Sequence, residues 1–221
     1  MRLPNIRVII FDLDDTLHDL RRYTFVAFRY TADMLSQEIG RKASELYLSM
    51  CQNYDESWWR SKIFDRILEE SGIDEPQTLI NKCRGWFLNA QHGTESLYDD
   101  TLLVLGVLGQ NYPLGILTDG EEVVQKRKIS ALGLYKYFKH IVTVTGGNQK
   151  PSSNGYIRVC NLFDVKPSEA LFIENNPYRD IAGASSIGMK VVWLRREGGW
   201  ANKEPPRELE VYPEWQIREL S

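Results

Sequence analysis

Three carboxylates lie close together near the start of the chain, at Asp12, Asp14 and Asp15. They follow the apolar run 8–11 (VIIF), which is rich in β-branched residues and is typical of a buried parallel strand. Parallel sheets bind ligands beyond the carboxyl ends of their strands. Acids crowded at such an end repel one another unless a cation or a ligand network compensates. The stretch therefore predicts a ligand site, with an acidic loop that caps a following helix as the alternative.

Polar residues are also expected at or near the ends of three later strands. These residues are, in chain order, Thr118, Asp119, Gly120, Lys150, Glu174, Asn175 and Asp180. In a parallel sheet they would face the same edge as Asp12. The sequence therefore predicts that an acid pair, a hydroxyl, a lysine and a second polar cluster lie close together at this edge.

This set suits phosphoryl transfer. Asp12 would attack phosphorus and form an aspartyl-phosphate, and Asp14 would protonate the leaving oxygen and later deprotonate the attacking water. A Mg²⁺ ion held by oxygen ligands would neutralise the repulsion between the carboxylate and the phosphate.

The remaining groups could hold the phosphate. The Thr118 hydroxyl and the backbone N–H groups of Asp119 and Gly120 would donate to phosphate oxygens. Lys150 would add a positive point charge.

The elements that must position these residues fall into two groups. Apolar residues at helical spacing predict four amphipathic helices in succession, over about 24–39, 43–54, 59–68 and 76–90. From about residue 99, helices alternate with strands expected at 114–118, 141–144, 170–173 and 190–194. We therefore predict an α/β fold. Its Rossmann-like, doubly wound parallel sheet comprises residues 1–17 and 97–221, and a cap similar to a four-helix bundle is inserted at 18–96.

A module inserted beside an active site is a natural lid, because it can exclude water and contact the substrate. The candidates for such contacts are His18, Trp58 and Arg60. The arginines after the last clear strand, Arg195 and Arg196, are expected on the surface.

Composition narrows the classes of function. The 221 residues carry a formal net charge of −3, which argues against a nucleic-acid-binding surface but not against a small phosphorylated ligand. There is no apolar run long enough to span a bilayer and no cleavable signal pattern, so a cytoplasmic protein without a membrane partner is expected. The three cysteines are far apart and are expected to be free thiols. The oligomeric state is not predictable from these features.

Several motifs together resemble those of the haloacid dehalogenase superfamily of phosphohydrolases. Residues 12–16 (DLDDT) match the family's DxDxT nucleophile loop, residues 118–120 (TDG) resemble its second motif, and residues 150–151 (KP) resemble its third. The resemblance implies that Asp12 is the nucleophile, that Asp14 is the general acid/base, and that Mg²⁺ binds Asp12 and the Asp14 main-chain carbonyl. It also favours a phosphatase over a dehalogenase, because dehalogenases lack an acid at the position of Asp14.

The fourth motif departs from the family's pattern. Family members usually have Gly-Asp or Glu-Asp here, whereas this chain has Glu174 followed by Asn175. Asn175 therefore aligns with a metal-binding carboxylate, and its amide oxygen can bind Mg²⁺ without adding charge. Glu174 and Asp180 are further candidates for metal binding.

We expect a Mg²⁺-dependent phosphomonoesterase that acts on a small phosphorylated metabolite, either a nucleoside monophosphate or a phosphosugar. The alternatives are a phosphomutase, or a binding or regulatory homologue in which Asn175 weakens the chemistry.

Overall fold

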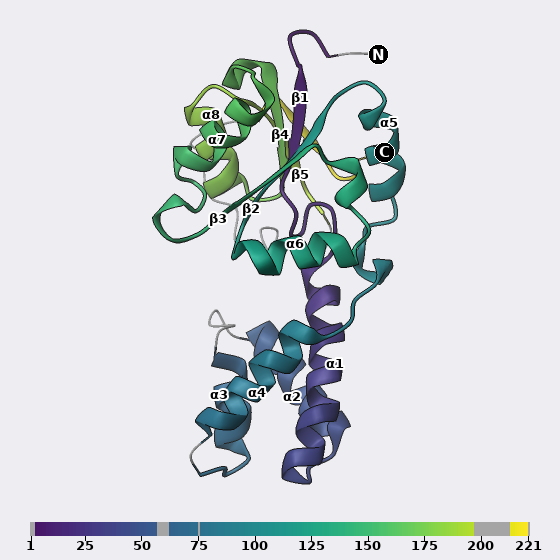
Figure 1. The fold of residues 1–221 in the computed structure, drawn as a ribbon, viewed down its shortest axis with the longest axis vertical. Coiled ribbons are helices and arrows are strands. Elements are labelled where there is room, and N and C mark those ends of the chain that lie inside the picture. The colour runs from purple at the N-terminus through teal and green to yellow at the C-terminus, as the bar shows by residue number, and fades with distance from the viewer. Residues whose placement is uncertain (1–2, 57–61, 75, 197–212, 221) are drawn as a thin grey trace. The chain divides into compact units, whose positions relative to one another are not determined.

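The computed structural model describes residues 3–56, 62–74, 76–196 and 213–220. The chain forms two compact units, one made of residues 1–20 and 96–221 and the other of residues 21–95, and Figure 1 labels the elements of both. Trp58 and Arg60, which were predicted to contact the substrate, lie outside the described residues.

The first unit is built on a six-stranded sheet in which every pair of neighbouring strands is parallel, in the order β3-β2-β1-β4-β5-β6. This confirms the predicted fold class. β1 lies between β2 and β4, so the loops after these three strands meet at one edge. The strands are β1 (Val8–Phe11), β2 (Leu114–Asp119), β3 (His140–Val144), β4 (Ala170–Glu174), β5 (Lys190–Leu194) and β6 (Trp215–Ile217).

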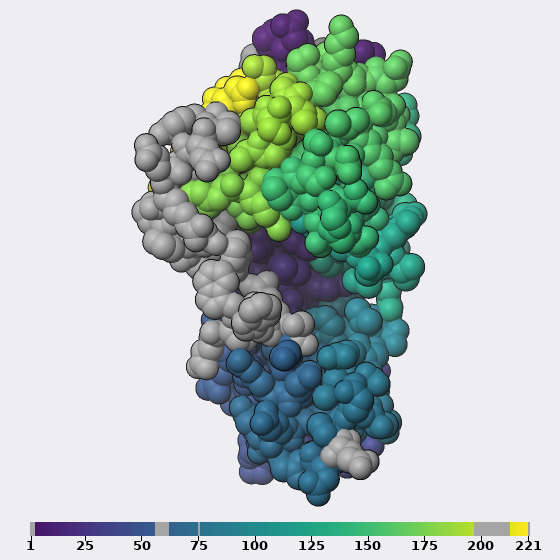
Figure 2. Space-filling view, turned by 90° about the vertical axis from the view of Figure 1, so that its left-hand side faces the viewer, coloured from purple at the N-terminus to yellow at the C-terminus, as the bar shows by residue number. Residues whose placement is uncertain are grey.

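Both faces of the sheet are covered. Val8 and Ile10 belong to an apolar cluster with residues of α7 (Ser153–Phe163) and α8 (Ala182–Ser186), a helical layer that Figure 2 shows from outside in green to yellow-green. Side chains alternate along a strand, so Ile9 and Phe11 face the opposite layer. That layer contains α5 (Thr101–Gly109) and α6 (Glu122–Ala131), and Figure 1 shows α5 on the side away from α7 and α8.

One helix differs from its predicted form. The sequence predicted an α-helix between the strands expected at 170–173 and 190–194, whereas the chain forms a π-helical turn at Pro177–Ile181 that leads into the short α8. Asn176 explains the tight entry, because its side-chain oxygen accepts hydrogen bonds from the N–H groups of Tyr178 (3.2 Å) and Arg179 (3.3 Å). This turn places Asp180 at the sheet edge.

The second unit is helical and has an apolar core of its own. Phe28, Leu35, Met50 and Ile67 are among the buried residues of this core. Cys83 is buried in it too, and all three cysteines of the chain are free thiols, as predicted. The helices are α1 (Leu20–Ile39), α2 (Ala43–Glu56), α3 (Ile63–Glu70) and α4 (Gln77–Asn89). In the part of the chain that the structure describes, no helix has the length and hydropathy required to cross a membrane.

The chain leaves and re-enters the first unit at one place. The Asp19 N–H donates to the Ser96 carbonyl (2.8 Å), and the Thr101 hydroxyl donates to the Leu17 carbonyl (2.7 Å). The two crossings therefore run side by side, held by one main-chain and one side-chain hydrogen bond.

Candidate active site

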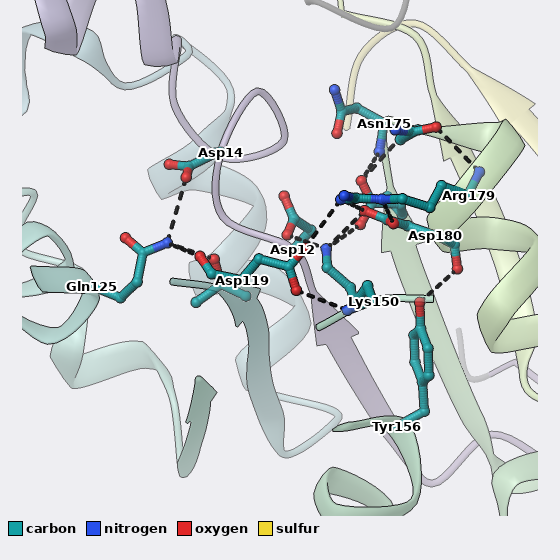
Figure 3. Close-up of polar contacts among 12 residues, drawn as sticks. Asp12, Asp14, Asp119, Gln125, Lys150, Tyr156, Asn175, Arg179 and Asp180 are labelled. Atoms are coloured by element: carbon teal, nitrogen blue, oxygen red, sulfur yellow. Dashed lines mark hydrogen bonds and ion pairs between the residues drawn. The ribbon is translucent and has the colours of Figure 1, made fainter. Parts of the chain in front are cut away.

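The site lies at the carboxyl ends of the three central strands. Asp12 follows β1, Thr118 and Asp119 end β2, Glu174 ends β4, and Lys150 lies in the loop after β3. Figure 3 shows Asp12, Asp119 and Lys150 close together. This is the edge at which the sequence predicted them to meet. Their proximity follows from the parallel sheet, because it places equivalent strand ends next to one another.

Lys150 is the centre of the polar network. Its Nζ lies 2.6 Å from Asp12 Oδ1, 2.8 Å from Glu174 Oε2 and 3.1 Å from Asp180 Oδ2. Lys150 is 4% exposed and Glu174 is fully buried. Burial opposes the charge of the ammonium, but the three carboxylates outweigh it and raise the pKa of Lys150. The lysine therefore stays charged and fixes the positions of these acids.

Two contacts hold the lysine's own backbone. Asp119 Oδ1 accepts a hydrogen bond from the Lys150 N–H (2.9 Å). The next residue, Pro151, packs against Gly183, where a Cβ would lie 2.8 Å from the Pro151 carbonyl oxygen and 2.9 Å from the Tyr156 hydroxyl. Only glycine allows this approach, so the position of Lys150 depends on a residue far from it in the sequence.

The two catalytic candidates have opposite electrostatic environments. Burial, aided by the nearby charge of Asp14 and opposed by that of Lys150, raises the pKa of Asp12 to about 6. Burial alone would raise the pKa of Asp14 as well, but the Lys128 ammonium and the imidazole of His18 hold it far below its usual range. These directions in the ligand-free protein are the reverse of those that a carboxylate nucleophile and a general acid require, so bound ligands must lower the pKa of Asp12 and raise that of Asp14.

Three side chains hold the Asp14 carboxylate. Lys128 Nζ and His18 Nε2 each lie 2.7 Å from Asp14 Oδ1, and Gln125 Nε2 lies 3.4 Å from Oδ2. Gln125 also donates to the Thr118 hydroxyl (3.0 Å) and the Asp119 carbonyl (2.5 Å). Figure 3 shows Gln125 between Asp14 and Asp119. Gln125 thus links the first and second motifs.

The acids near β4 are already bonded. Glu174 Oε1 accepts from the N–H groups of Asn175 (2.9 Å) and Asn176 (3.1 Å). Asp180 binds the Arg179 guanidinium through both oxygens, at 2.5 Å from Nε and 3.0 Å from Nη2. Arg179 Nη2 also reaches Asp119 Oδ2 (3.1 Å) and so bridges the second and fourth motifs.

Some predicted roles change with this geometry. The Gly120 N–H donates to the Val144 carbonyl (2.9 Å), so in this structure it does not face a phosphate. His18 is fully buried in the first unit and holds Asp14, so its predicted role as a cap contact to the substrate is not supported. Asp15 caps α1, because its Oδ1 accepts from the Leu20 N–H (3.0 Å), as the alternative interpretation of the acidic loop proposed.

The surface position expected for Arg196 is wrong. Arg196 is 4% exposed and binds both oxygens of Asp100, at 2.7 and 2.8 Å. Its Nε also donates to the Thr16 carbonyl (3.3 Å), so it braces the loop that carries the first motif. Its partner Asp100 is far away in the sequence, so no local pattern could show this pairing.

The sequence also failed to identify Gln125, Lys128 and Arg179. Gln125 and Lys128 are three residues apart on α6, directly after the second motif, and such spacing puts two side chains on one helix face. That spacing was an available signal. Arg179 gave no signal, because an arginine beside an acid is most often a solvated surface pair.

A divalent cation would find oxygen ligands here. Among the described residues, no group of three or more His, Cys, Asp or Glu side chains is arranged to hold a metal ion. Mg²⁺ does not require such a cage, since it commonly binds one or two carboxylates together with substrate phosphates and waters. Asp12 supplies a carboxylate, and the Asp14 main-chain carbonyl and the Asn175 amide are hard, neutral oxygen donors. This donor set fits Mg²⁺.

Known proteins resemble this chain in sequence and in fold. The sequence model of the family described as "Haloacid dehalogenase-like hydrolase" matches residues 9–194. The glyceraldehyde 3-phosphate phosphatase of Pyrococcus furiosus is 31% identical, over 99% of this chain and 91% of that protein. The N-acylneuraminate-9-phosphatase of Rattus norvegicus is 25% identical, over 90% and 86%. The crystal structure of the HAD-hydrolase YfnB from Bacillus subtilis, bound to magnesium, has a TM-score of 0.70 at 22% identity and covers 97% of this chain and 95% of that one.

Proposed function

The chain belongs to the haloacid dehalogenase-like hydrolase family, and we propose that it is a Mg²⁺-dependent phosphomonoesterase acting through a phosphorylated Asp12. The observation that carries the proposal is the buried Asp12 carboxylate, 2.6 Å from the Lys150 ammonium and two residues before Asp14. The relatives named as phosphatases support hydrolysis of a phosphate ester.

The reaction has two balanced steps. An Asp12 oxygen attacks phosphorus, the bond to the leaving oxygen breaks, and Asp14 gives that oxygen a proton. Water then attacks the phosphorylated Asp12 and gives its proton to Asp14, and the carboxylate of Asp12 leaves. Phosphate is released, Asp14 returns the proton to solvent, and both acids regain their starting bonds.

Asp14 must therefore gain a proton before the first step. In the free protein Lys128 and His18 favour its ionised form. A phosphate dianion that enters beside Asp14 disfavours a second negative charge there, and this raises the pKa of the carboxyl group. Once the proton has gone to the leaving oxygen, Lys128 and His18 stabilise the carboxylate that remains.

The other residues of the site bind and orient. Lys150 and the Thr118 hydroxyl hold phosphate oxygens, while Glu174 and Asp180 keep Lys150 in place. Asp12, the Asp14 main-chain carbonyl and Asn175 would hold Mg²⁺. When bound, the ion offsets the repulsion between the Asp12 carboxylate and the phosphate.

We also propose that the helical unit, which corresponds to the predicted cap at 18–96, acts as a lid during the reaction. An inserted module can exclude water and read the part of the substrate that does not react. The magnesium-bound structure of YfnB is described as revealing interdomain movement, which is consistent with such a role.

The substrate is a small phosphorylated metabolite. Relatives with this architecture are named for glyceraldehyde 3-phosphate and N-acylneuraminate 9-phosphate, so a phosphorylated sugar or sugar derivative is favoured over a nucleoside monophosphate. The second candidate function is a binding or regulatory homologue with weak chemistry, and the specific observation for it is the neutral Asn175 in the fourth motif.

Turnover separates these functions. We expect hydrolysis of p-nitrophenyl phosphate that requires Mg²⁺ and is abolished in Asp12→Asn, while the exposed Asp99→Asn control keeps full activity. A panel of phosphorylated metabolites would then rank sugar phosphates against nucleoside monophosphates. Absence of turnover at any millimolar Mg²⁺ concentration would contradict the enzyme and favour the binding homologue.

A further inference from the structure

The acidic side chains on the β4 side of the site are not available to a metal ion. Glu174 is fully buried, and its oxygens bond to two backbone N–H groups and to Lys150. Asp180 is 3% exposed at its side chain, and its oxygens bond to Arg179 and Lys150. A metal ion could use either acid only by displacing these partners, each of which is a strong hydrogen-bond donor.

The remaining donors carry little charge. Asp12 is the one acid of the proposed metal ligand set that acts through its carboxylate, and Lys150 already lies 2.6 Å from its Oδ1. Asn175 supplies a neutral amide, and the contribution of Asp14 is its main-chain carbonyl. Affinity for a divalent cation rises with the number of charged oxygen ligands, so this set binds Mg²⁺ weakly by itself.

A phosphate group changes this balance, because it brings further anionic oxygens to the same place. We propose that in this chain Mg²⁺ and the phosphoryl group bind cooperatively, and that Arg179 is a positioning residue that enforces the cooperativity by keeping Asp180 away from the metal. The inference rests on the proposed function for its location, and it concerns binding rather than turnover.

Arg179 suits this role because of its place in the network. Its guanidinium reaches Asp180 through Nε and Nη2, and the same Nη2 reaches Asp119 Oδ2 (3.1 Å), as Figure 3 shows. The planar fork of an arginine holds a carboxylate in one orientation, which a lysine could not do. Two motifs are thus tied together by a side chain that is itself 48% exposed.

The test is a calorimetric titration of Mg²⁺ into the protein, with and without saturating inorganic phosphate. In the wild type, phosphate should tighten Mg²⁺ binding by roughly 5- to 150-fold, the usual range for coupled ligands, and Mg²⁺ should tighten phosphate binding by the same factor. Asn175→Asp adds a charged ligand and should tighten binding of Mg²⁺ alone by roughly tenfold, with a smaller coupling factor. Arg179→Met should act in the same direction by releasing Asp180.

The matched control is Arg7→Met. Arg7 is also an exposed arginine paired with an acid, Glu169, but it precedes β1 and lies at the opposite edge of the sheet. Its removal should leave both Mg²⁺ affinities unchanged.

A wild-type coupling factor near one, or failure of phosphate to bind, would overturn the inference. A loss of coupling in Arg7→Met equal to that in Arg179→Met would overturn the role of Arg179. Hydrolysis of p-nitrophenyl phosphate, measured in parallel, separates this inference from the proposed function. Turnover without coupling refutes only the inference, and coupling without turnover refutes only the enzyme.

Discussion

Replacing Asp12 by asparagine is expected to stabilise the metal-free protein at neutral pH while it removes turnover. Asp12 is 5% exposed, and burial raises its pKa to about 6 despite the Lys150 ammonium. The difference of roughly two pH units from the ordinary value of 3.8 corresponds to about 3 kcal/mol against the ionised carboxyl group. Asparagine has nearly the same shape and no charge, so the variant avoids this penalty.

The pH dependence of folding stability follows from the direction in which folding shifts the pKa of Asp12. Because the pKa of Asp12 is higher in the folded than in the unfolded protein, folding favours the protonated form. The wild type therefore keeps its full stability below about pH 4 and loses about 3 kcal/mol as the pH rises through about 6. Asp12→Asn has no such loss, so the two stability curves meet near pH 4 and diverge toward pH 8.

Urea unfolding in the presence of a chelator, followed by circular dichroism between pH 4 and pH 8, measures this difference. At pH 8 the midpoint of the variant should be higher by about 1.5 M, for a slope of about 2 kcal/mol/M. The exposed Asp99→Asn serves as the charge-matched control and should follow the wild type. If Asp12→Asn is no more stable than the wild type at pH 8, Asp12 is not held in an unfavourable ionised state, and the reasoning fails.

Two further substitutions test how the site is braced. Gly183→Ala should destabilise the protein by about 1–3 kcal/mol in chemical unfolding, since the new Cβ would lie 2.8 Å from a backbone oxygen. Gly147→Ala meets nothing within 4 Å, and an equal loss there would refute the packing argument. Arg196→Met should cost about 1.5–3 kcal/mol at pH 7, because the partly buried Asp100 loses a charged partner that binds both of its oxygens. Its salt bridge lowers the pKa of Asp100, although burial opposes this, so the loss should shrink as the pH falls through that lowered pKa; a loss that is the same at pH 3 would contradict this origin.

The sequence predicted the parts of the site that depend on strand ends. Asp12, Lys150 and Glu174 are far apart in the chain, yet each follows an apolar run or its turn, and the carboxyl ends of parallel strands meet at one edge. The position of these residues is therefore a property of the sheet, which strand patterns reveal. The alternation of helices and strands predicted the fold class, because such alternation is typical of a parallel sheet covered by helices.

The contacts between side chains could not be predicted in this way. Lys128 contacts Asp14 because α6 starts directly after β2. Arg196 is buried because it binds Asp100, which lies directly before α5. Both depend on how helices pack on the sheet, which spacing within one element does not specify. The role of Asp14 as a paired carboxylate in the free protein emerged only from these contacts.

The paired crossings at Asp19 and Ser96 have a consequence for how this protein family can change. The hydrogen bond from the Asp19 N–H to the Ser96 carbonyl (2.8 Å) holds the two ends of the insertion together. Residues 21–95 therefore form a closed loop on the core unit, whatever their sequence. Closing a loop of twice the length costs only about 0.6 kcal/mol more, so the core can accept inserts of very different size at this point. A new cap, and with it a new substrate, can thus be acquired by exchanging one contiguous segment of the gene while the catalytic residues stay untouched.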